Sequence, residues 1–489
     1  MSDALIGVDW LPWAIGIPLI YAVAAFLLGP RTGRALALPA SALGLLAAIG
    51  VAVRVYRLGP QRHTVGDWSP PLGIGLYADG LAAALLLMTA AIALAVSAYA
   101  RDYFRADRDA GHFWPLTGFL IAAMNALYLS ADAFNLYVTL ELLGLAAVGL
   151  VALGGGVQAV AAALRYLLAA LLGSLFYLLG VALLYGAYGT LALDELAAAL
   201  APGPLAWTTL ALMTVGLAIK TALFPLHVWL PPAHGGAPAP VSALLSALVV
   251  KASFYLLLRL WFDVFAGSVS IAAAQALGAL GAGAILWGSW LALRQEQLKM
   301  LVAYSTVAQI GYLFLLFPLA AFGDGAGSAW NGGVYQALAH GFAKASMFLA
   351  AGAMILAAGH GEIARHDGLG ARLPLALFAF ALSAVSLMGL PPSGGFVAKW
   401  LLLEAALASG QWWWIAVMIA GGLLTAAYLF RVLRRAFLPA AADVTFSEPP
   451  RALAPIAFLL ALVALGLGLW ADGPLALIGI GAPFAEPPP

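Results

Sequence analysis

The chain has 489 residues, of which 64% are hydrophobic and 9% are charged, and its formal net charge is +1 at pH 7. Soluble domains carry about a quarter charged residues, so this composition excludes a soluble globular protein and indicates an integral membrane protein. The small net charge argues against a nucleic-acid partner, and the absence of cysteine excludes disulfides, iron–sulfur ligation and thiol catalysis on this chain.

Apolar runs long enough to cross a bilayer follow one another along nearly the whole chain. A transmembrane helix needs about 20 mostly apolar residues, and we place roughly fourteen such runs. No polar segment between them is long enough for a soluble domain. We therefore predict an all-α, polytopic membrane protein with one membrane domain over residues 1–489. The runs lie at 11–29, 35–56, 76–100, 113–130, 132–153, 160–187, 205–223, 239–262, 270–293, 299–320, 333–357, 373–391 continuing into 395–408, 412–436 and 452–472.

The basic residues of the loops predict an orientation, because lysine and arginine are more abundant in cytoplasmic loops. The loops after the odd-numbered runs hold most of them, and the opposite loops hold only Arg54, Arg57, Arg62 and Arg259. We expect a bacterial inner-membrane protein with both termini on the non-cytoplasmic side. The predicted cytoplasmic set is Arg31, Arg34, Arg101, Arg105, Arg108, Arg165, Arg294, Lys299, Arg365, Arg372, Arg431, Arg434, Arg435 and Arg451.

Lysine and arginine occupy different places in this chain. Four of its five lysines lie inside apolar runs, whereas arginines fill nearly all the basic loop positions. Ionisable groups inside a membrane are costly to hold and often mark an ion or proton pathway. The pKa of an ammonium group falls readily on burial, whereas a guanidinium stays charged. A row of buried lysines therefore indicates a proton or cation path, and its members are Lys220, Lys251, Lys344 and Lys399.

Proline and glycine interrupt two of the apolar runs beside these lysines. Proline removes a backbone donor and breaks helices, and non-helical backbone at membrane depth is tolerated only where protein or water covers it. Two halves that each contain an interrupted run near a lysine are typical of internally repeated transporters, whose sites lie beside broken helices. The breaking residues are Pro225, Pro231, Pro232, Pro238 and Pro240 after Lys220, and Pro391, Pro392, Gly394 and Gly395 before Lys399.

Glu141 lies well inside the fifth apolar run. An uncompensated carboxylate there would protonate or find a cation. If Glu141 faces Lys220, the pair would form a switch that holds the lysine charged when the two are together and lets it release a proton when they separate. The alternative is a static ion pair that holds two helices in register.

Three histidines are candidates for proton relay, because imidazole titrates near neutrality. His340 lies four residues before Lys344 and so shares a helix face with it. His227 and His234 lie in the proline-rich break. The alternative for each is a hydrogen bond to a broken-helix carbonyl without any titration. Glu404, nearer the end of its run than Lys399, is a further candidate for the path.

Other functional classes find less support in the residues. We see no glycine-rich nucleotide loop, phosphate cradle or metal-ligand spacing, so we expect no cofactor and no metal. Ser305 and Thr306 are expected to serve helix packing. An unrelated secondary solute carrier stays open as an alternative, although four buried lysines without matching acids would be unusual unless its substrate were anionic.

The segments that hold these residues resemble the antiporter-like subunits shared by Mrp-type cation/proton antiporters, respiratory complex I and membrane-bound hydrogenases. The resemblance covers roughly residues 75–435. It implies about fourteen core helices with two inverted five-helix repeats, each containing a broken helix. The segments are FNLYVTLELL around Glu141, GLAIKTALFPLHVWLPPAHGGAPAPVSALLSALVVKASFYLLLR around Lys220 and Lys251, LRQEQLKMLVAYSTVAQIGY, AHGFAKASMFLAAG around Lys344 and SLMGLPPSGGFVAKW around Lys399.

The resemblance also implies a division of the membrane domain. Residues 1–110 would form N-terminal spans, 111–265 the first antiporter-like repeat, 266–437 the second repeat, and 438–489 a loop and the C-terminal span. Relatives often have Pro-Asp-Ala-His where this chain has Pro-Pro-Ala-His at 231–234, so it lacks an acid beside the broken helix.

The resemblance further implies roles for the buried residues in passing protons along the membrane plane. Glu141 and Lys220 would be the ion pair of the first half, Lys251 the connecting residue, Lys344 the central lysine of the second half, and Lys399 the terminal lysine. We expect no enzyme activity from the chain alone. We expect sister membrane subunits in a hetero-oligomeric complex and transport of protons with Na⁺ or K⁺, without a nucleic-acid partner.

The subtype within this family is predicted from one residue and from length. Lys399 favours the D-type subunit of a Mrp-type Na⁺(K⁺)/H⁺ antiporter or another complex I paralogue, because one of the complex I antiporter-like subunits has Glu at that place. The short segment after the last span fits the D-type subunit. The alternative is a proton-pumping antiporter-like subunit of complex I (NADH-quinone oxidoreductase) or of a related hydrogenase.

Overall fold

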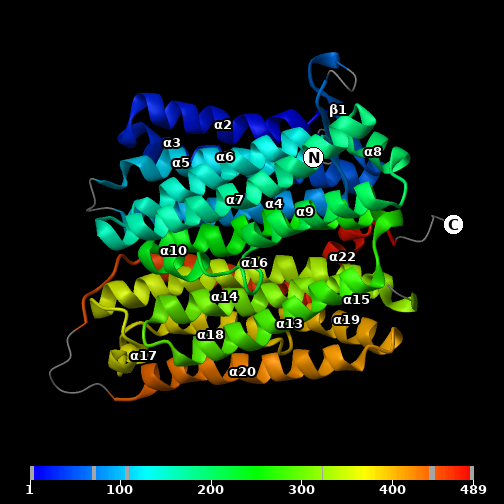
Figure 1. Cartoon of the computed structure of the whole chain (residues 1–489). Coiled ribbons are helices and arrows are strands. Elements are labelled where there is room, and N and C mark those ends of the chain that lie inside the picture. The colour runs from blue at the N-terminus through cyan, green and yellow to red at the C-terminus, as the bar shows by residue number, and fades with distance from the viewer. Residues whose placement is uncertain (1–4, 69–72, 105–108, 322, 440–445, 485–489) are drawn as a thin grey trace.

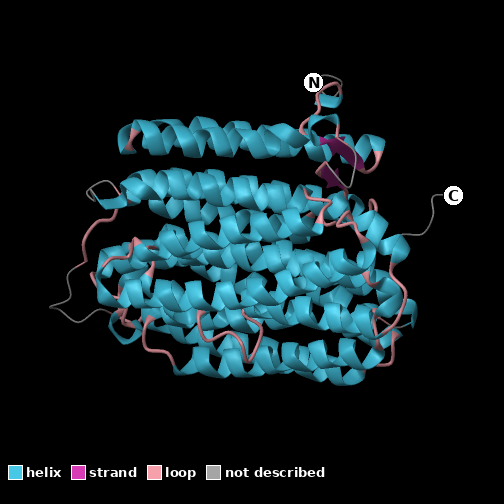
Figure 2. Cartoon of the chain, turned by 45° about the horizontal axis from the view of Figure 1, so that its top comes forward, coloured by secondary structure: helices cyan, strands magenta, loops and turns pink. Residues whose placement is uncertain are grey.

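The computed structural model describes residues 5–68, 73–104, 109–321, 323–439 and 446–484. Most of the long helices lie side by side along a common direction and form one slab (Figure 1). The described chain is helical except for one short hairpin of two strands at an end of the slab (Figure 2). The predicted single, all-α membrane domain thus has one small β element that the apolar runs did not indicate.

Three long helices and the hairpin form the N-terminal part. In the antiparallel hairpin, Gln61 pairs with Ala78 and Thr64 pairs with Gly75. The elements are α2 (Leu11–Leu28), α3 (Pro30–Leu58), β1 (Gln61–Thr64), β2 (Gly75–Ala78) and α4 (Gly80–Tyr103).

The next part of the chain contains one interrupted helix, α9 followed by α10, and one helix with two wide, π-helical turns, η3 and η4. Its elements are α5 (Phe113–Leu129), α6 (Ala133–Ala152), α7 (Gly156–Tyr188), α8 (Leu193–Ala199), α9 (Pro204–Thr221), α10 (Leu230–Gly236), α11 (Ala239–Leu244), η3 (Leu245–Val249), α12 (Val250–Arg259) and η4 (Leu260–Val264).

The following part contains the second interruption, between α18 and α19. The helices of this part, in chain order, are α13 (Ile271–Arg294), α14 (Leu298–Phe314), α15 (Leu316–Ala320), α16 (Ala326–Ala358), α17 (Leu369–Arg372), α18 (Pro374–Met388), α19 (Gly394–Ala408), α20 (Trp412–Phe437), α21 (Leu453–Leu469) and α22 (Asp472–Ile478).

Fewer helices are full-length spans than the apolar runs suggest. Within the described ranges, 11 helices are long and apolar enough to cross a membrane, or 12 if the bent pair α21 and α22 is one span. The runs at 113–130 and 373–391 form shorter apolar helices of 17 and 15 residues, α5 and α18. The chain is therefore a multi-pass membrane protein in which several apolar runs do not make complete straight spans.

Helix starts follow ordinary capping chemistry. The Asp79 carboxylate accepts the Ala82 N–H at 3.0 Å at the start of α4, and the Asp132 carboxylate accepts the Asn135 N–H at 2.8 Å at the start of α6. Such side chains satisfy backbone donors that have no partner within the helix. Burial raises the pKa of Asp132 above its usual value, although the backbone bonds at the cap oppose this rise.

Close contact between helices depends on small residues. A Cβ atom on Gly311 of α14 would lie 2.3 Å from the carbonyl oxygen of Gly281 in α13. Membrane helices associate through such small residues, because lipid provides no hydrophobic driving force between apolar helices. Helix α14 is consequently held tightly against α13 on one side, and its opposite side is available for polar contacts.

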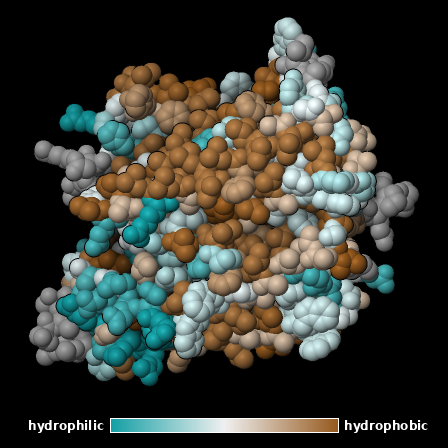
Figure 3. Space-filling model, in the orientation of Figure 1, coloured by the Kyte–Doolittle hydropathy of each residue, from teal (hydrophilic) through white to brown (hydrophobic). Residues whose placement is uncertain are grey.

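Polar groups collect at the two ends of the slab. One end holds the α2–α3 turn and α17, where hydrophilic side chains gather, while apolar side chains cover the middle of this face (Figures 1 and 3). There Arg34 donates to the carbonyl of Arg101 at 2.7 Å, and Arg435 pairs with Asp367 at 3.4 Å. Two of the basic residues used to predict the orientation, Arg105 and Arg108, lie outside the described residues.

The hairpin, α8 and α22 lie at the other end of the slab (Figure 1). Arg62 of the hairpin pairs with Asp194 of α8 at 2.7 Å, and this hydrogen bond lowers the pKa of Asp194. The Gly80 N–H donates to the carbonyl of Ile480 at 2.8 Å, which joins the start of α4 to the segment after α22. The first and last described residues thus lie at the same end.

Candidate functional site

The first predicted break positions Lys220. Helix α9 ends at Thr221 with Lys220 in its last turn, and Ala222 has a left-handed backbone with φ of 59°. The Trp229 indole donates to the carbonyl of Ile219 at 2.8 Å, and its ring stacks on Tyr166 with 4.2 Å between centroids. Protein groups therefore cover the exposed helix end, as membrane depth requires.

The second break positions Lys399 in the same manner. Helix α18 ends at Met388 and is capped by Gly389, whose left-handed φ of 82° turns the chain, and α19 begins at Gly394. The Lys399 amine donates to the carbonyl of Leu387 at 2.6 Å. The last carbonyls of a helix have no partner within it. The break thus supplies the acceptor that holds the amine of Lys399.

Glu141 and Lys220 form the predicted ion pair. The Lys220 Nζ lies 3.1 Å from the Glu141 Oε1, and the two side chains are 7% and 20% exposed. Ser174 also donates to this carboxylate. Three helices, α6, α7 and α9, therefore meet at one buried ion pair.

Lys251 and Lys344 both hydrogen-bond to residues that the Ser246 and Thr306 hydroxyls connect. The Lys251 amine donates to the carbonyl of Ser246 at 2.6 Å, and the hydroxyls of Ser246 and Thr306 lie 2.9 Å apart. Thr306 donates to the carbonyl of Val302 at 3.1 Å, so Ser246 is the donor of the hydroxyl pair. The Lys344 amine donates to the same carbonyl of Val302 at 2.9 Å. The two lysines are therefore linked through Ser246, Thr306 and the Val302 carbonyl.

A second series ends at Lys399. The carbonyl of Leu387, which accepts from Lys399, also accepts from the Gln309 amide at 3.1 Å. The Gln336 amide donates to the side-chain oxygen of Gln309 at 3.0 Å. The Lys399 amine lies 4.1 Å from the centre of the Tyr312 ring, a distance at which the ring face attracts a cation.

One face of α14 joins these series, and the sequence prediction missed it. Val302, Ser305, Thr306 and Gln309 lie at helical spacing, and Ser305 accepts from Lys344. Ser305 and Thr306 therefore do more than the helix packing expected of them, because both hydroxyls take part in the hydrogen bonds between α14 and the lysines. The polar residues of AYSTVAQIGY at positions 305, 306, 309 and 312 share one helix face, and that spacing was the available signal.

His340 lies between the two series. Gln336, His340 and Lys344 follow at four-residue intervals on α16, and the outer two contact α14 directly. His340 is 1% exposed, and within the described ranges neither of its ring nitrogens has a hydrogen-bond partner. The described structure therefore does not support the alternative to a relay role at His340, which was a hydrogen bond to a broken-helix carbonyl.

The other two histidines differ from His340. His234 is buried on α10, and its ring stacks on Phe348 of α16 with 4.9 Å between centroids. His227 stacks on Phe224 in the break with 5.8 Å between ring centroids, and its Nδ1 has no hydrogen-bond partner within the described ranges. The structure brings His234 against the helix that carries Lys344 but leaves His227 within its own loop.

Glu404 does not join the other candidates. It is exposed on α19, five residues beyond Lys399, and the described structure gives it no hydrogen bond or ion pair. Across the described ranges, no group of three or more His, Asp or Glu side chains is arranged to hold a metal ion.

The multi-pass helical slab contains helix breaks, buried lysines and hydroxyls that connect them. These features define an antiporter-like membrane subunit. Residues 130–425 match the family model described as NADH:quinone oxidoreductase/Mrp antiporter, transmembrane region. The chain is 39% identical over 477 residues to the N subunit of NADH-quinone oxidoreductase from Desulforudis audaxviator, covering 93% of both proteins. The chain therefore belongs to the NADH:quinone oxidoreductase/Mrp antiporter family.

Other relatives and solved structures agree with this membership. The chain is 30% identical over 398 residues to the D-type subunit of the Na(+)/H(+) antiporter from Alkalihalophilus pseudofirmus, covering 80% of this chain and 79% of that protein. It resembles a chain of the Mrp complex from Dietzia sp. with a TM-score of 0.88 and 28% identity over 96% of both chains. A chain of respiratory complex I from Thermus thermophilus matches with a TM-score of 0.76 and 27% identity, covering 94% of this chain and 98% of that one. The family membership removes the support for an unrelated solute carrier.

The Glu141 and Lys220 pair predicts a measurable coupling. Removing one partner of a buried ion pair leaves the other charge uncompensated, whereas removing both is far less costly. We expect Glu141→Gln and Lys220→Met each to lower the unfolding free energy by ~1–3 kcal/mol, and the double variant to lower it by less than their sum. Thermal unfolding of the four purified proteins gives this comparison. Strictly additive effects would contradict a direct pairing.

Proposed function

We propose that this chain is a proton-translocating antiporter-like subunit of a multi-subunit membrane complex. The observation that carries the proposal is the row of polar groups between Lys251 and Lys344 along α14, in which the Ser246 and Thr306 hydroxyls lie 2.9 Å apart and both lysine amines bond to backbone carbonyls beside them. Broken helices place Lys220 at one end of this line and Lys399 at the other. Buried lysines that touch hydroxyls and carbonyls can exchange protons without a metal or a cofactor.

The proposed path begins at the ion pair. A proton would be held on Lys220 while Glu141 is close, and it would move to Lys251 when the pair separates. The hydroxyl of Thr221, the residue after Lys220, donates to Ser253 at 2.8 Å, and Ser253 lies two residues from Lys251. These two hydroxyls, together with water, are the groups that would bridge the first step.

The second half of the path includes His340. Serine and threonine hydroxyls both donate and accept protons, whereas a glutamine amide keeps fixed donors and a fixed acceptor. Gln309 and Gln336 therefore position the Leu387 carbonyl and would not carry protons themselves. An unpartnered imidazole lies between Lys344 and Gln336 on α16, and His340 is thus the group suited to take the proton toward Lys399.

The remaining candidates have smaller roles in this proposal. His234, stacked against α16, would take part in proton uptake from the end of the slab that holds the α10–α11 junction. His227 and Glu404 have lower priority, because one stacks within its own loop and the other faces outward.

Two contexts fit the chain, and we favour a complex I type. This preference is supported by 39% identity over 93% of both proteins to the N subunit of a NADH-quinone oxidoreductase, against 30% identity over 80% of this chain to the D-type subunit of a Na(+)/H(+) antiporter. Lys399 fits either a Mrp D-type subunit or another complex I paralogue, so it does not oppose this preference. The higher TM-score to the Mrp complex keeps the Mrp type as the second candidate.

The finer architecture belongs to the same proposal. We propose fourteen crossings in which the shorter helices α5 and α18 also take part, with inverted five-helix repeats over residues 111–265 and 266–437. Residues 1–110 and 438–489 would flank them. We further propose a bacterial inner-membrane location with both termini outside the cytoplasm, and assembly with sister membrane subunits. The chain alone would not be an enzyme, although a complex I context would make it part of a redox-driven translocase.

Lys344→Gln tests the proton path. Glutamine can still hydrogen-bond to Ser305 and the Val302 carbonyl, but it cannot carry a proton, so driven proton transport by the complex should fall about tenfold or more. Transport is measured as acidification of liposomes that contain the complete complex. Arg165→Gln, which changes an exposed residue of α7, is the control and should keep the wild-type rate. A normal rate in assembled Lys344→Gln complex would refute the proposal.

The type of complex is tested by co-purification and by ion dependence. We expect an affinity-tagged chain from native membranes to bring down quinone-reducing subunits, and its proton transport to follow quinone reduction in buffer that lacks Na⁺ and K⁺. Co-purification of small antiporter subunits alone, with proton flux that requires Na⁺ or K⁺, would instead identify the Mrp type.

A further inference from the structure

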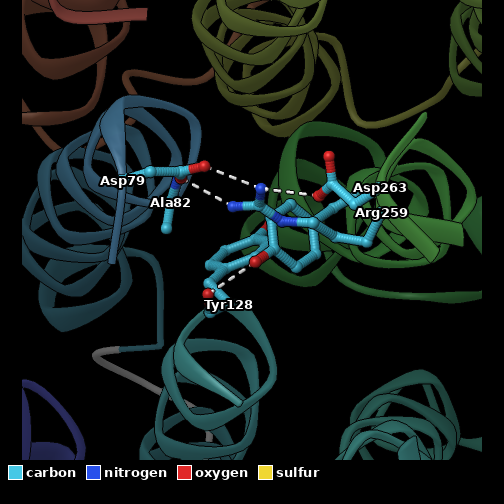
Figure 4. A network of polar contacts seen from close by, with 6 residues as sticks. Asp79, Ala82, Tyr128, Arg259 and Asp263 are labelled. Carbon is cyan, nitrogen blue, oxygen red and sulfur yellow. Dashed lines mark hydrogen bonds and ion pairs between the residues drawn. The ribbon is translucent and has the colours of Figure 1, made fainter. Parts of the chain in front are cut away.

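A second buried charge cluster lies apart from the lysine line, at the end of the slab that holds the hairpin. Arg259 of α12 contacts both oxygens of Asp79, at 2.7 Å and 2.6 Å, and donates to Asp263 at 3.1 Å (Figure 4). The side chains of Arg259 and Asp79 are 7% and 2% exposed, and that of Asp263 is 36% exposed. Because Asp79 also caps α4 through Ala82, the guanidinium is fixed between two helices.

Arg259 belongs to a polar stripe that starts at one of the proposed path lysines. Lys251, Tyr255, Arg259 and Asp263 follow at four-residue intervals, so they share one face of α12 and η4. The helical rise places the backbone of Arg259 about 12 Å from that of Lys251. The stripe therefore leads from a buried amine to an exposed carboxylate at the surface.

Aromatic rings close this stripe between its two ends. The Tyr255 ring meets the Tyr128 ring edge to face at 5.1 Å, and its hydroxyl donates to the Tyr128 carbonyl at 2.7 Å. The Arg259 guanidinium lies over the Tyr255 ring at 4.9 Å. On the other side, the Lys251 amine turns away from Tyr255 and toward the Ser246 carbonyl. Two packed aromatic rings and a stacked guanidinium therefore fill the middle of the stripe. A proton-conducting path would instead need groups there that exchange protons.

The chemistry of arginine adds to this steric closure. A guanidinium cannot be deprotonated in a protein, so it cannot pass a proton along a chain. The two carboxylates compensate its charge and keep it buried.

We propose that Arg259, held by Asp79 and stacked on Tyr255, is a seal that keeps protons on Lys251 from reaching the aqueous phase at the hairpin end. The seal confines proton movement to the lateral line, and this inference rests on the proposed function. A purely structural ion pair that only fastens α4 to α12 would have the same contacts but would not control leakage.

Arg259→Gln tests the seal, because it removes the charge and keeps a hydrogen-bonding side chain. Liposomes containing the complete complex, without a driving reaction or cation gradient, should dissipate an imposed pH gradient several-fold faster than wild type. A trapped pH-sensitive dye reports the rate. Arg259→Lys replaces the guanidinium with an amine that can release a proton, so it should also leak faster than wild type. Arg62→Gln, which opens the exposed pair with Asp194 at the same end, should not leak.

A second substitution separates a leak through the stripe from loosened packing. In the Arg259→Gln/Lys251→Met double variant the leak should return to the wild-type rate, because the stripe then starts at no titratable group. A leak that persists in this double variant, or an Arg259→Gln complex that leaks no more than wild type, would overturn the proposal. If Arg259→Gln does not assemble, Asp79→Asn releases the same guanidinium and should leak likewise, and absence of a leak there would equally overturn it.

Driven transport in the same liposomes distinguishes this proposal from the proposed function. If the Lys344→Gln complex transports protons at the wild-type rate, the proton path is refuted, whatever the leak rate of Arg259→Gln. Transport that depends on Lys344, together with an unchanged leak in Arg259→Gln, would refute the seal alone.

Discussion

An ammonium group inside a membrane slab must find polar partners, and this requirement organises the structure. Lys220 has a carboxylate, but Lys251, Lys344 and Lys399 are held in the described structure by backbone carbonyls, a hydroxyl and an aromatic face. Neutral acceptors remain in place when an amine loses its proton, whereas a carboxylate fixes the positive charge. The choice of partners thus suits groups that gain and lose protons.

Irregular backbone supplies these partners. The end of α18 leaves the Leu387 carbonyl for Lys399, and the wide turn η3 presents the Ser246 carbonyl to Lys251. Arg259 differs from these lysines, because two carboxylates rather than neutral acceptors hold its permanent charge. The lysines along the slab, with their neutral partners, would carry protons laterally. The arginine near the surface of the slab, with its acidic partners, would prevent those protons from leaking out.

The sequence predicted much of this arrangement, because burial and helix breaking are local properties. Lysines within apolar runs and the breaks beside Lys220 and Lys399 follow from such properties, whereas the approach of Glu141 to Lys220 was implied by the family resemblance. Contacts that depend on how helices rotate against one another did not follow. The α14 face shows this, because its hydroxyls look like packing groups until α11, η3 and α16 are placed around them.

Two differences from the expectations have physical reasons as well. Glu404 lies five residues after Lys399, and five residues turn a helix by about 140° from the starting face, so a carboxylate there points outward. The runs at 113–130 and 373–391 give shorter helices than hydropathy alone indicates, because proline and glycine chemistry ends α18 early, and α5 ends at Leu129. The hairpin between α3 and α4 is too short and polar for any hydropathy signal.

The central claim is that the hydroxyls of α14 connect lysines into one proton path. Thr306→Val tests it most directly, because valine has nearly the same shape, removes the hydroxyl between Ser246 and the Val302 carbonyl, and leaves all four lysines in place. In liposomes with the complete complex, we expect driven proton transport several-fold slower than wild type while the amount of assembled complex is unchanged. A wild-type transport rate in the assembled Thr306→Val complex would contradict the account.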